Sequence, residues 1–145
     1  MYRPTDILFF REYLFNDTGQ EAPHYGLVII PSTLTQFKES ILCAVMTSQI
    51  VRNKYGTHKI LATDYPELPK DTTIRLREFD YVPFSGLHTG IQQPITKLNN
   101  IDSRKCFKVL KGLLFGNSSP LGEDPYLRGT IMREWKKVIN ITPNL

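Results

Sequence analysis

The segment from Ile41 to Met46 is a continuous apolar run, and the chain turns polar at Thr47 directly after it. A run of this length and composition predicts a β-strand that is buried on both faces. The polar groups of Thr47, Ser48 and Gln49 must therefore find partners or face a cleft. A basic loop with one aromatic residue follows and contains Arg52, Asn53, Lys54, Tyr55 and His58. A strand that delivers polar groups into a basic loop is typical of binding and catalytic sites, and the alternative is a plain turn with a solvated loop.

The size and charge of the chain favour one small domain. It has 145 residues, of which 41% are hydrophobic, and this is enough for a real core. Its formal net charge is +4 and its pI about 9.1. A mildly basic protein is compatible with a nucleic acid or an acidic partner, but the charge does not decide between them.

The two cysteines show no zinc-site spacing, and we expect Cys43 and Cys106 to be small buried residues in a reducing compartment. An apolar run near the N-terminus, residues 7–10, is interrupted at once by Arg11 and Glu12, which is unlike a signal peptide. No segment approaches the length of a membrane span. We therefore expect a cytoplasmic protein without a membrane partner, a metal or a cofactor.

Several other short segments carry the composition of strands. β-Branched and aromatic residues between turn residues mark these segments. They are Asp6 to Phe15, Leu27 to Ile30 (stopped by Pro31), His58 to Ala62, Thr72 to Leu76 and Gln93 to Leu98. The stretch from Asp64 to Asp71 holds two prolines and is expected to be a loop.

Two helices are expected late in the chain. The first starts with Asp102 or Ser103 as N-cap and ends at Gly116. The second begins at Pro125 and carries an apolar stripe of Leu127, Ile131, Trp135 and Val138 beside a basic face that solvation alone can explain. Short strands followed by late helices predict a mainly β protein with α, built as a small curled β-barrel with helical appendages.

The order of these segments resembles the MazF/PemK family of toxin endoribonucleases from bacterial toxin–antitoxin pairs. The likeness rests on the serial match and not on any single motif. It runs through Arg3 to Ile7, Thr18 to Glu21, Leu27 to Pro31, Leu42 to Gln49, Lys54 to Ile60 and Gln93 to Asp102. Residues after about 117 have no counterpart that we can place.

The resemblance implies an SH3-like barrel, a fold that the family shares with CcdB, in residues 1–116 with a packed C-terminal helix. Residues 117–145 would then form a linker and an extra terminal helix, which packs on the barrel or on a dimer partner. The family resemblance also implies a homodimer, an acidic antitoxin as protein partner, and sequence-selective cleavage of single-stranded RNA without a metal. In that reaction the 2′-hydroxyl attacks the adjacent phosphate and leaves a cyclic phosphate.

The family places catalytic groups at an Arg before its second strand and at the Thr or Ser that ends its third. Thr47 matches the second position, whereas the first falls on Tyr25, so His24 beside it is the candidate acid or base. Loss of a cationic donor in such a site typically costs about 10²–10³ in rate. The expected catalytic residues are His24 and Thr47. The expected RNA-binding residues are Tyr25, Ser48, Gln49, Arg52, Lys54 and His58, with His88 a weaker candidate.

Each of these assignments has a plainer alternative: a loop histidine at 24, a barrel-rim aromatic at 25, a strand-capping hydroxyl at 47, and solvated residues in the basic loop. In the catalytic interpretation, Thr47 lies within hydrogen-bond reach of His24 or Tyr25, and Arg52, Lys54 and His58 line the same rim. Two other functions remain open. One is a barrel that binds RNA or a protein without cutting, and the other is a CcdB-like poison of gyrase.

Overall fold

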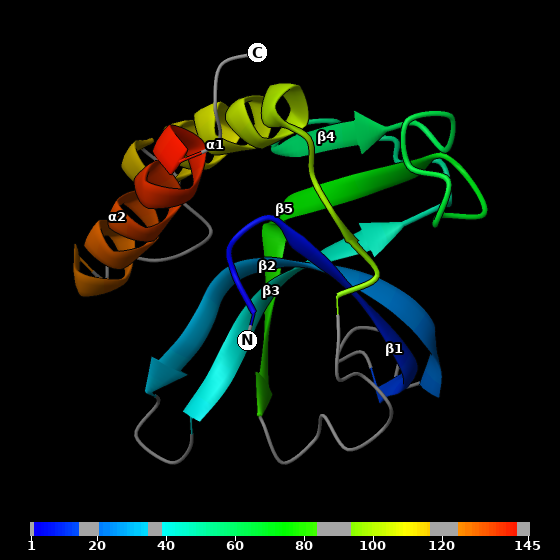
Figure 1. Cartoon of the computed structure of the whole chain (residues 1–145), viewed down its shortest axis with the longest axis horizontal. Helices are drawn as coiled ribbons and strands as arrows, with labels where there is room; N and C mark the ends of the chain where they lie inside the picture. Colours follow the sequence, from blue (N-terminus) through cyan, green and yellow to red (C-terminus); the bar gives the residue numbers. More distant parts are fainter. Residues whose placement is uncertain (1, 15–20, 35–38, 84–93, 117–124, 142–145) are drawn as a thin grey trace.

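The computed structural model of the chain describes residues 2–14, 21–34, 39–83, 94–116 and 125–141. Within them, six antiparallel strands form one curled, half-barrel sheet in the order β4-β5-β3-β2-β1-β6, and two helices lie together on one side of it (Figure 1). The elements are β1 (Asp6–Leu14), β2 (Glu21–Leu34), β3 (Glu39–Thr47), β4 (Thr57–Ile60), β5 (Thr72–Pro83), β6 (Thr96–Lys97), α1 (Asn100–Phe115) and α2 (Pro125–Ile141). The protein is mainly β with α, as its sequence predicts.

Strand β3 lies between β2 and β5, and its alternate residues point to opposite faces of the sheet. Leu42, Ala44 and Met46 face the helices and belong to the larger core cluster. Ile41 and Cys43 belong to a smaller cluster on the other face. The apolar run is therefore buried on both sides, which confirms the prediction from its composition.

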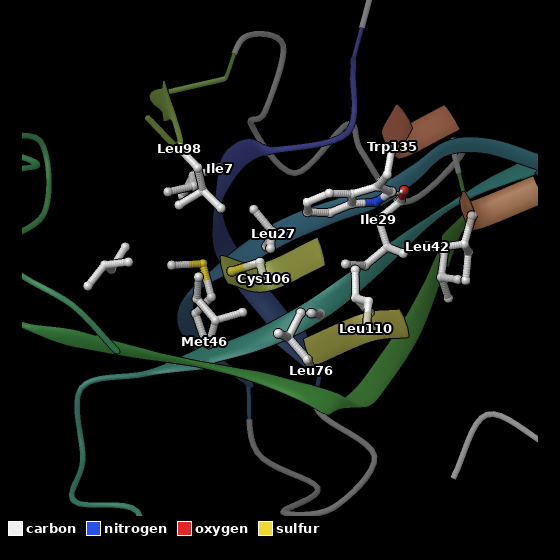
Figure 2. Packing of buried hydrophobic residues seen from close by; sticks show 14 of the residues in the cluster. Ile7, Leu27, Ile29, Leu42, Met46, Leu76, Leu98, Cys106, Leu110 and Trp135 are labelled. Atoms are coloured by element: carbon white, nitrogen blue, oxygen red, sulfur yellow. Dashed lines mark hydrogen bonds between the residues drawn. The ribbon is translucent and has the colours of Figure 1, made fainter. Parts of the chain in front are cut away.

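Helix α2 closes the larger core against the sheet. Trp135 and Ile131 are fully buried, and the Trp135 indole N–H donates to the backbone carbonyl of Ile29 at 2.9 Å. Figure 2 shows the indole lying over Ile29 and Leu27. The ring also stacks on Phe107 of α1, with centroids 6.4 Å apart. The apolar stripe of α2 therefore fixes both helices to the same sheet.

Several element boundaries differ from the sequence-based expectation. Strand β2 continues through Pro31 instead of stopping there. This part of β2 pairs only with β3, and the register shifts between Ile30 and Thr33. The missing proline N–H therefore removes no regular hydrogen bond between the strands. Strand β5 extends to Pro83 and β6 is much shorter than predicted.

The N-cap of α1 is Asn99, whose side chain accepts from the Asp102 N–H at 2.8 Å. The prediction of Asp102 or Ser103 as N-cap is therefore wrong. The helix begins one turn earlier because the Asn99 amide can reach the N–H of the first turn.

Three further features bear on the sequence-based expectations. Cys43 and Cys106 are both buried, as expected, but in different core clusters. No helix among the described residues is long and apolar enough to cross a membrane. His88 and most of Thr18 to Glu21 lie outside the described residues.

Candidate functional site

A polar pocket of about 190 Å³ opens where β3 ends, and we call it the arginine pocket. It lies between the end of β3, the segment that follows β3, and β5. Its lining combines one hydroxyl, two side-chain amides and three guanidinium groups with two apolar residues. These residues are Thr47, Gln49, Ile50, Val51, Arg52, Asn53, Arg75 and Arg77.

Strand register brings Thr47 and Arg75 to the same face of the sheet. Val45 of β3 pairs with Arg75 of β5, and Thr47 pairs with Thr73. Residues paired across two strands point to the same face, so Thr47 and Arg75 are diagonal neighbours. Met46 and Ile74, which alternate with them, point into the larger core. The two polar side chains therefore lie on the face that the helices do not cover.

The segment that follows β3 is shaped by short side-chain to backbone hydrogen bonds. The Gln49 N–H donates to Thr47 Oγ1 at 3.1 Å, and the Tyr55 N–H donates to Asn53 Oδ1 at 3.1 Å. Hydroxyl and amide side chains hold turns in this way. Ile50 is 96% exposed at the pocket, an unusual position for a large apolar side chain.

Arg75 is the most constrained cation of the arginine pocket. One guanidinium NH₂ group pairs with Glu78, three residues further along β5. Its Nε is buried and makes no hydrogen bond with any described residue. A buried donor without a partner carries a desolvation cost. Arg75 lines the pocket with a positively charged group, which favours an anionic or carbonyl group there.

Arg77 lies across Gly56. A Cβ added at Gly56 would fall 2.4 Å from Arg77 Cγ, and Gly56 has φ +70°, a backbone conformation that favours glycine. The Arg77 guanidinium carbon lies 5.6 Å from the centroid of the Tyr55 ring, a cation–π arrangement. Gly56 thus lets the Arg77 side chain lie flat, so that its charge reaches both the pocket and Tyr55.

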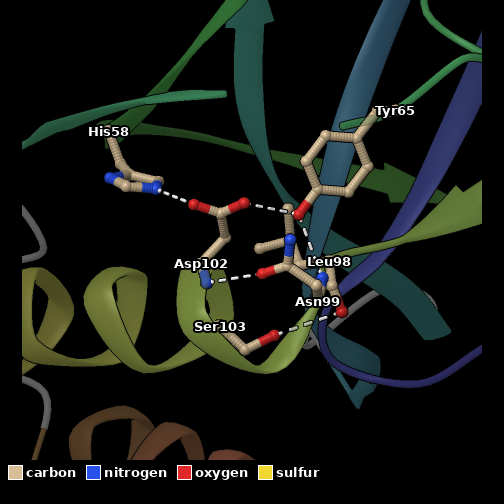
Figure 3. A network of polar contacts seen from close by, with 6 residues as sticks. All are labelled: His58, Tyr65, Leu98, Asn99, Asp102 and Ser103. Carbon is tan, nitrogen blue, oxygen red and sulfur yellow. Dashed lines mark hydrogen bonds and ion pairs between the residues drawn. The ribbon is translucent and has the colours of Figure 1, made fainter. Parts of the chain in front are cut away.

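A second polar cluster lies at the start of α1 and is shown in Figure 3. The Asp102 carboxylate accepts from the Tyr65 hydroxyl at 2.6 Å and lies 2.7 Å from His58 Nε2. The Asn99 N–H donates to the Tyr65 oxygen at 3.0 Å. This network joins β4, the turn segment around Tyr65 and the first turn of α1.

The network corrects the expected position of His58. Its pairing partner on β5 is Ile74, a core residue, so His58 faces α1 and lies on the opposite face from Thr47. Its side chain is 15% exposed. Burial, and then the hydrogen bond to Asp102, raise the pKa of Tyr65 above its ordinary value. The expectation that His58 lines the same rim as Thr47 is therefore wrong.

The structure places the backbone of Tyr25 beside the end of β3 but does not bring the Tyr25 side chain to Thr47. Tyr25 pairs with Met46, and the next step of that antiparallel register lies between His24 and Thr47. The Tyr25 ring points the other way from Thr47: it packs against the larger core and lies 5.1 Å from the Phe9 ring. Tyr25 therefore fits the plainer alternative of a packing aromatic. The His24 side chain lies outside the described residues.

The other predicted residues divide into two groups. Thr47, Gln49 and Arg52 line the arginine pocket together, whereas Ser48 and Lys54 are exposed and do not line it. The Lys54 carbonyl instead accepts from the Thr57 hydroxyl at 2.7 Å.

Arg75 and Arg77 were not predicted as site residues. Their signal was present in the alternation T-T-I-R-L-R of residues 72–77, in which Ile74 and Leu76 are core residues and the two arginines point elsewhere. Such a pattern reads first as an ordinary half-exposed strand. The pairing of β3 with β5 is what identifies the arginines as neighbours of Thr47.

The chemistry of the arginine pocket is that of an anion-binding site. Arginine presents a planar fork of donors that matches phosphate, and none of the described lining residues is acidic. Among the described residues, no group of three His, Cys, Asp or Glu side chains could hold a metal ion. The described pocket residues thus provide donors and positive charge but no imidazole or carboxylate base.

Comparisons with known proteins identify no family for this chain. No protein-family model matches the chain, and no curated protein matches it.

Proposed function

We propose that this protein is a toxin-like endoribonuclease that binds the phosphate backbone of single-stranded RNA in the arginine pocket. The observation that carries the proposal is the convergence of Arg52, Arg75 and Arg77 with the Thr47 hydroxyl in one pocket on an open sheet face. Clustered arginines are the usual means of contacting nucleic-acid phosphates, and the net charge of +4 agrees with it.

The proposed fold is the SH3-like barrel of the MazF/PemK resemblance. The curled six-stranded sheet, with α1 packed against β4 and β5, supports this assignment. We also propose that the protein is a homodimer and that an acidic antitoxin binds it, because a positively charged pocket attracts an acidic protein as well as RNA.

The proposed reaction is attack of a ribose 2′-oxygen on the adjacent phosphorus. A P–O2′ bond forms, the P–O5′ bond breaks, and the products are a 2′,3′-cyclic phosphate and a 5′-hydroxyl. The 2′-hydroxyl loses a proton and the leaving 5′-oxygen gains one; we assign one of these transfers to His24 and the other to water. Arg75 and Thr47 donate to the developing phosphorane charge. Arg75 thereby supplies the cation that the family takes from the position occupied here by Tyr25.

A second function, RNA binding without cleavage, is favoured by the position of Tyr25. Its ring packs against the core and Phe9, so it offers no donor to the arginine pocket. The described pocket residues also include no general base. In this alternative the protein keeps the phosphate-binding half of the site and lacks the proton-transfer half.

The test combines binding and cleavage of one single-stranded RNA. We expect tight binding at low salt, and an affinity that falls as salt rises, because phosphate contacts release counterions. Arg52→Ala should weaken binding and reduce the salt slope by roughly one contact. Lys136→Ala, which removes the same charge from an exposed site on α2, is the control and should change neither.

Cleavage is read from the RNA ends. Products with cyclic phosphate ends support the proposed reaction, and RNA with a 2′-deoxy nucleotide at the cut position should be bound but not cut. His24→Ala should lower the rate by about 10²-fold or more, the range for a lost general acid or base, and Thr47→Ala should lower it less. Bound but intact RNA would establish the second function, and absence of binding would contradict both.

A further inference from the structure

The exposed ring of Tyr55 lies beside the arginine pocket and has no structural role in the core. Its side chain is 55% exposed, and the Arg77 guanidinium lies over the ring at 5.6 Å. An exposed tyrosine is ordinary in itself. A tyrosine held in place by a cation that also lines an anion-binding pocket needs a separate explanation.

The backbone that carries this ring is held by three features. The Tyr55 N–H donates to Asn53 Oδ1 at 3.1 Å, and Asn53 lines the arginine pocket. Gly56 follows with φ +70° and carries the Arg77 side chain across its backbone. The Leu76 N–H donates to the Gly56 carbonyl at 2.9 Å, which joins this turn to β5. The backbone at Tyr55 is therefore held within the chain and Arg77 lies over the ring, so binding would need to immobilise less of this segment.

We propose that Tyr55, backed by Arg77, is a stacking platform for a nucleobase next to the phosphate in the arginine pocket. This inference rests on the proposed function, because it names how the same site holds the rest of the nucleotide. Proteins that bind single-stranded nucleic acids combine a basic groove with aromatic rings on which bases stack. The Arg77 cation over the ring and the exposed part of the Tyr55 side chain supply both parts, one from β5 and the other from the turn that follows β3.

The platform favours single strands over duplexes. A base in a duplex is stacked between its neighbours and is not free to lie on a protein ring, whereas a base in a single strand is. Stacking on a tyrosine tolerates every base because each has a π face, so Tyr55 contributes affinity and register more than sequence selectivity. The pocket then positions the phosphate beside the stacked base.

The experiment measures binding of the full chain to RNA that cannot be cut. The probe is a 2′-O-methyl RNA of about ten nucleotides, within the range of single-strand sites, and a matched series carries one abasic position at each place in turn. We expect Tyr55→Ala to weaken binding of the intact probe by roughly 10-fold or more, and Tyr55→Phe to keep parental affinity because the ring remains. Circular dichroism should show that both variants are folded.

The abasic series separates stacking from other effects. With the abasic position at the platform, the parent and Tyr55→Ala should bind equally, and the salt slope of Tyr55→Ala should equal that of the parent. Equal affinity of Tyr55→Ala and the parent on the intact probe would overturn the platform while leaving the phosphate pocket in place. A loss that persists at every abasic position would also overturn it. If the parent binds no RNA, the proposed function and the platform both fail.

Discussion

The Asp102 carboxylate offers a direct test of how α1 is fixed to the sheet. It accepts a hydrogen bond from Tyr65 at 2.6 Å, lies 2.7 Å from His58 Nε2, and is 14% exposed. Asp102→Ala removes both contacts and leaves the Tyr65 hydroxyl without its acceptor. A hydrogen bond to an ionised group contributes about 1.5–3 kcal/mol, and water can replace part of it at a site that is not fully buried. We therefore expect a loss of roughly 2–4 kcal/mol in the free energy of unfolding.

A double-mutant cycle isolates the Tyr65 contact from the rest. Tyr65→Phe removes the donor to Asp102 and the acceptor for the Asn99 N–H, and should cost about 1–3 kcal/mol. Each single variant loses the same Tyr65–Asp102 bond, so the loss in the double variant should be smaller than the sum of the two. The expected difference, or coupling energy, is about 1–2 kcal/mol.

The measurement is urea unfolding at neutral pH, followed by circular dichroism for the parent, both single variants and the double variant. Asp64→Asn is the control, because Asp64 is an exposed carboxylate in the same segment as Tyr65, and it should change stability by less than about 0.5 kcal/mol. Additive effects, with a coupling energy below about 0.5 kcal/mol, would refute the reasoning. Helix α1 would then be held to the sheet by its apolar contacts alone.

Three further predictions concern the fold. Burial and the bond to Asp102 raise the pKa of Tyr65, so above about pH 10 the folded chain keeps a proton that the unfolded chain loses, and the free energy of unfolding should fall as pH rises. Urea titrations from about pH 9 to 11 should show a shallower fall for Tyr65→Phe than for the parent. Trp135→Phe removes the donor to the Ile29 carbonyl and some buried volume, and should lower unfolding free energy by about 2–4 kcal/mol in urea; a change below about 0.5 kcal/mol would contradict this. Thr5 has φ +79°, a backbone conformation that costs a non-glycine residue about 1–2 kcal/mol. After the extra entropy of an unfolded glycine is subtracted, Thr5→Gly should raise the free energy of unfolding by up to ~1 kcal/mol and thus the melting temperature; a lower melting temperature would contradict backbone strain at Thr5.

The types of the elements could be predicted from the sequence, because apolar periodicity is a local signal. The run from Ile41 to Met46 and the α2 stripe through Ile131 and Trp135 report burial directly. The ends of the strands are harder to predict from the sequence. The local sequence predicts that the strand ends at Pro31, yet β2 continues because at this point it pairs with a neighbouring strand on one side only. The pairing of strands is a property of the folded sheet and cannot be predicted from the local sequence pattern.

The candidate site was predictable to the extent that it follows one strand along the chain. Thr47, Gln49 and Arg52 lie within a few residues of each other, and a strand end followed by a basic segment indicates them together. Arg75 is distant in the sequence and lies beside these residues because β5 pairs with β3. His58 does not lie beside them, because its pairing with Ile74 directs its side chain towards α1. Successive strand residues point to opposite faces of the sheet, so a shift of one residue changes the face on which a side chain lies. The sequence alone does not show which residues of β4 and β5 share a face with Thr47.

Several irregular features of this fold lie around the arginine pocket, although others lie elsewhere, such as Thr5 and the register shifts between β2 and β3. In the pairing of β3 with β5, Ala44 lies opposite Phe79 and Val45 opposite Arg75, so the register shifts between these two pairs. The β5 residues at this shift include Arg77, whose guanidinium lies over the Tyr55 ring in the turn that follows β3. The left-handed Gly56 lies beneath the same side chain. The same place holds the Arg75 Nε, which is buried without a hydrogen bond to any described residue, and Ile50, which is 96% exposed. Loss of local regularity beside three arginine side chains is the arrangement expected of a binding site.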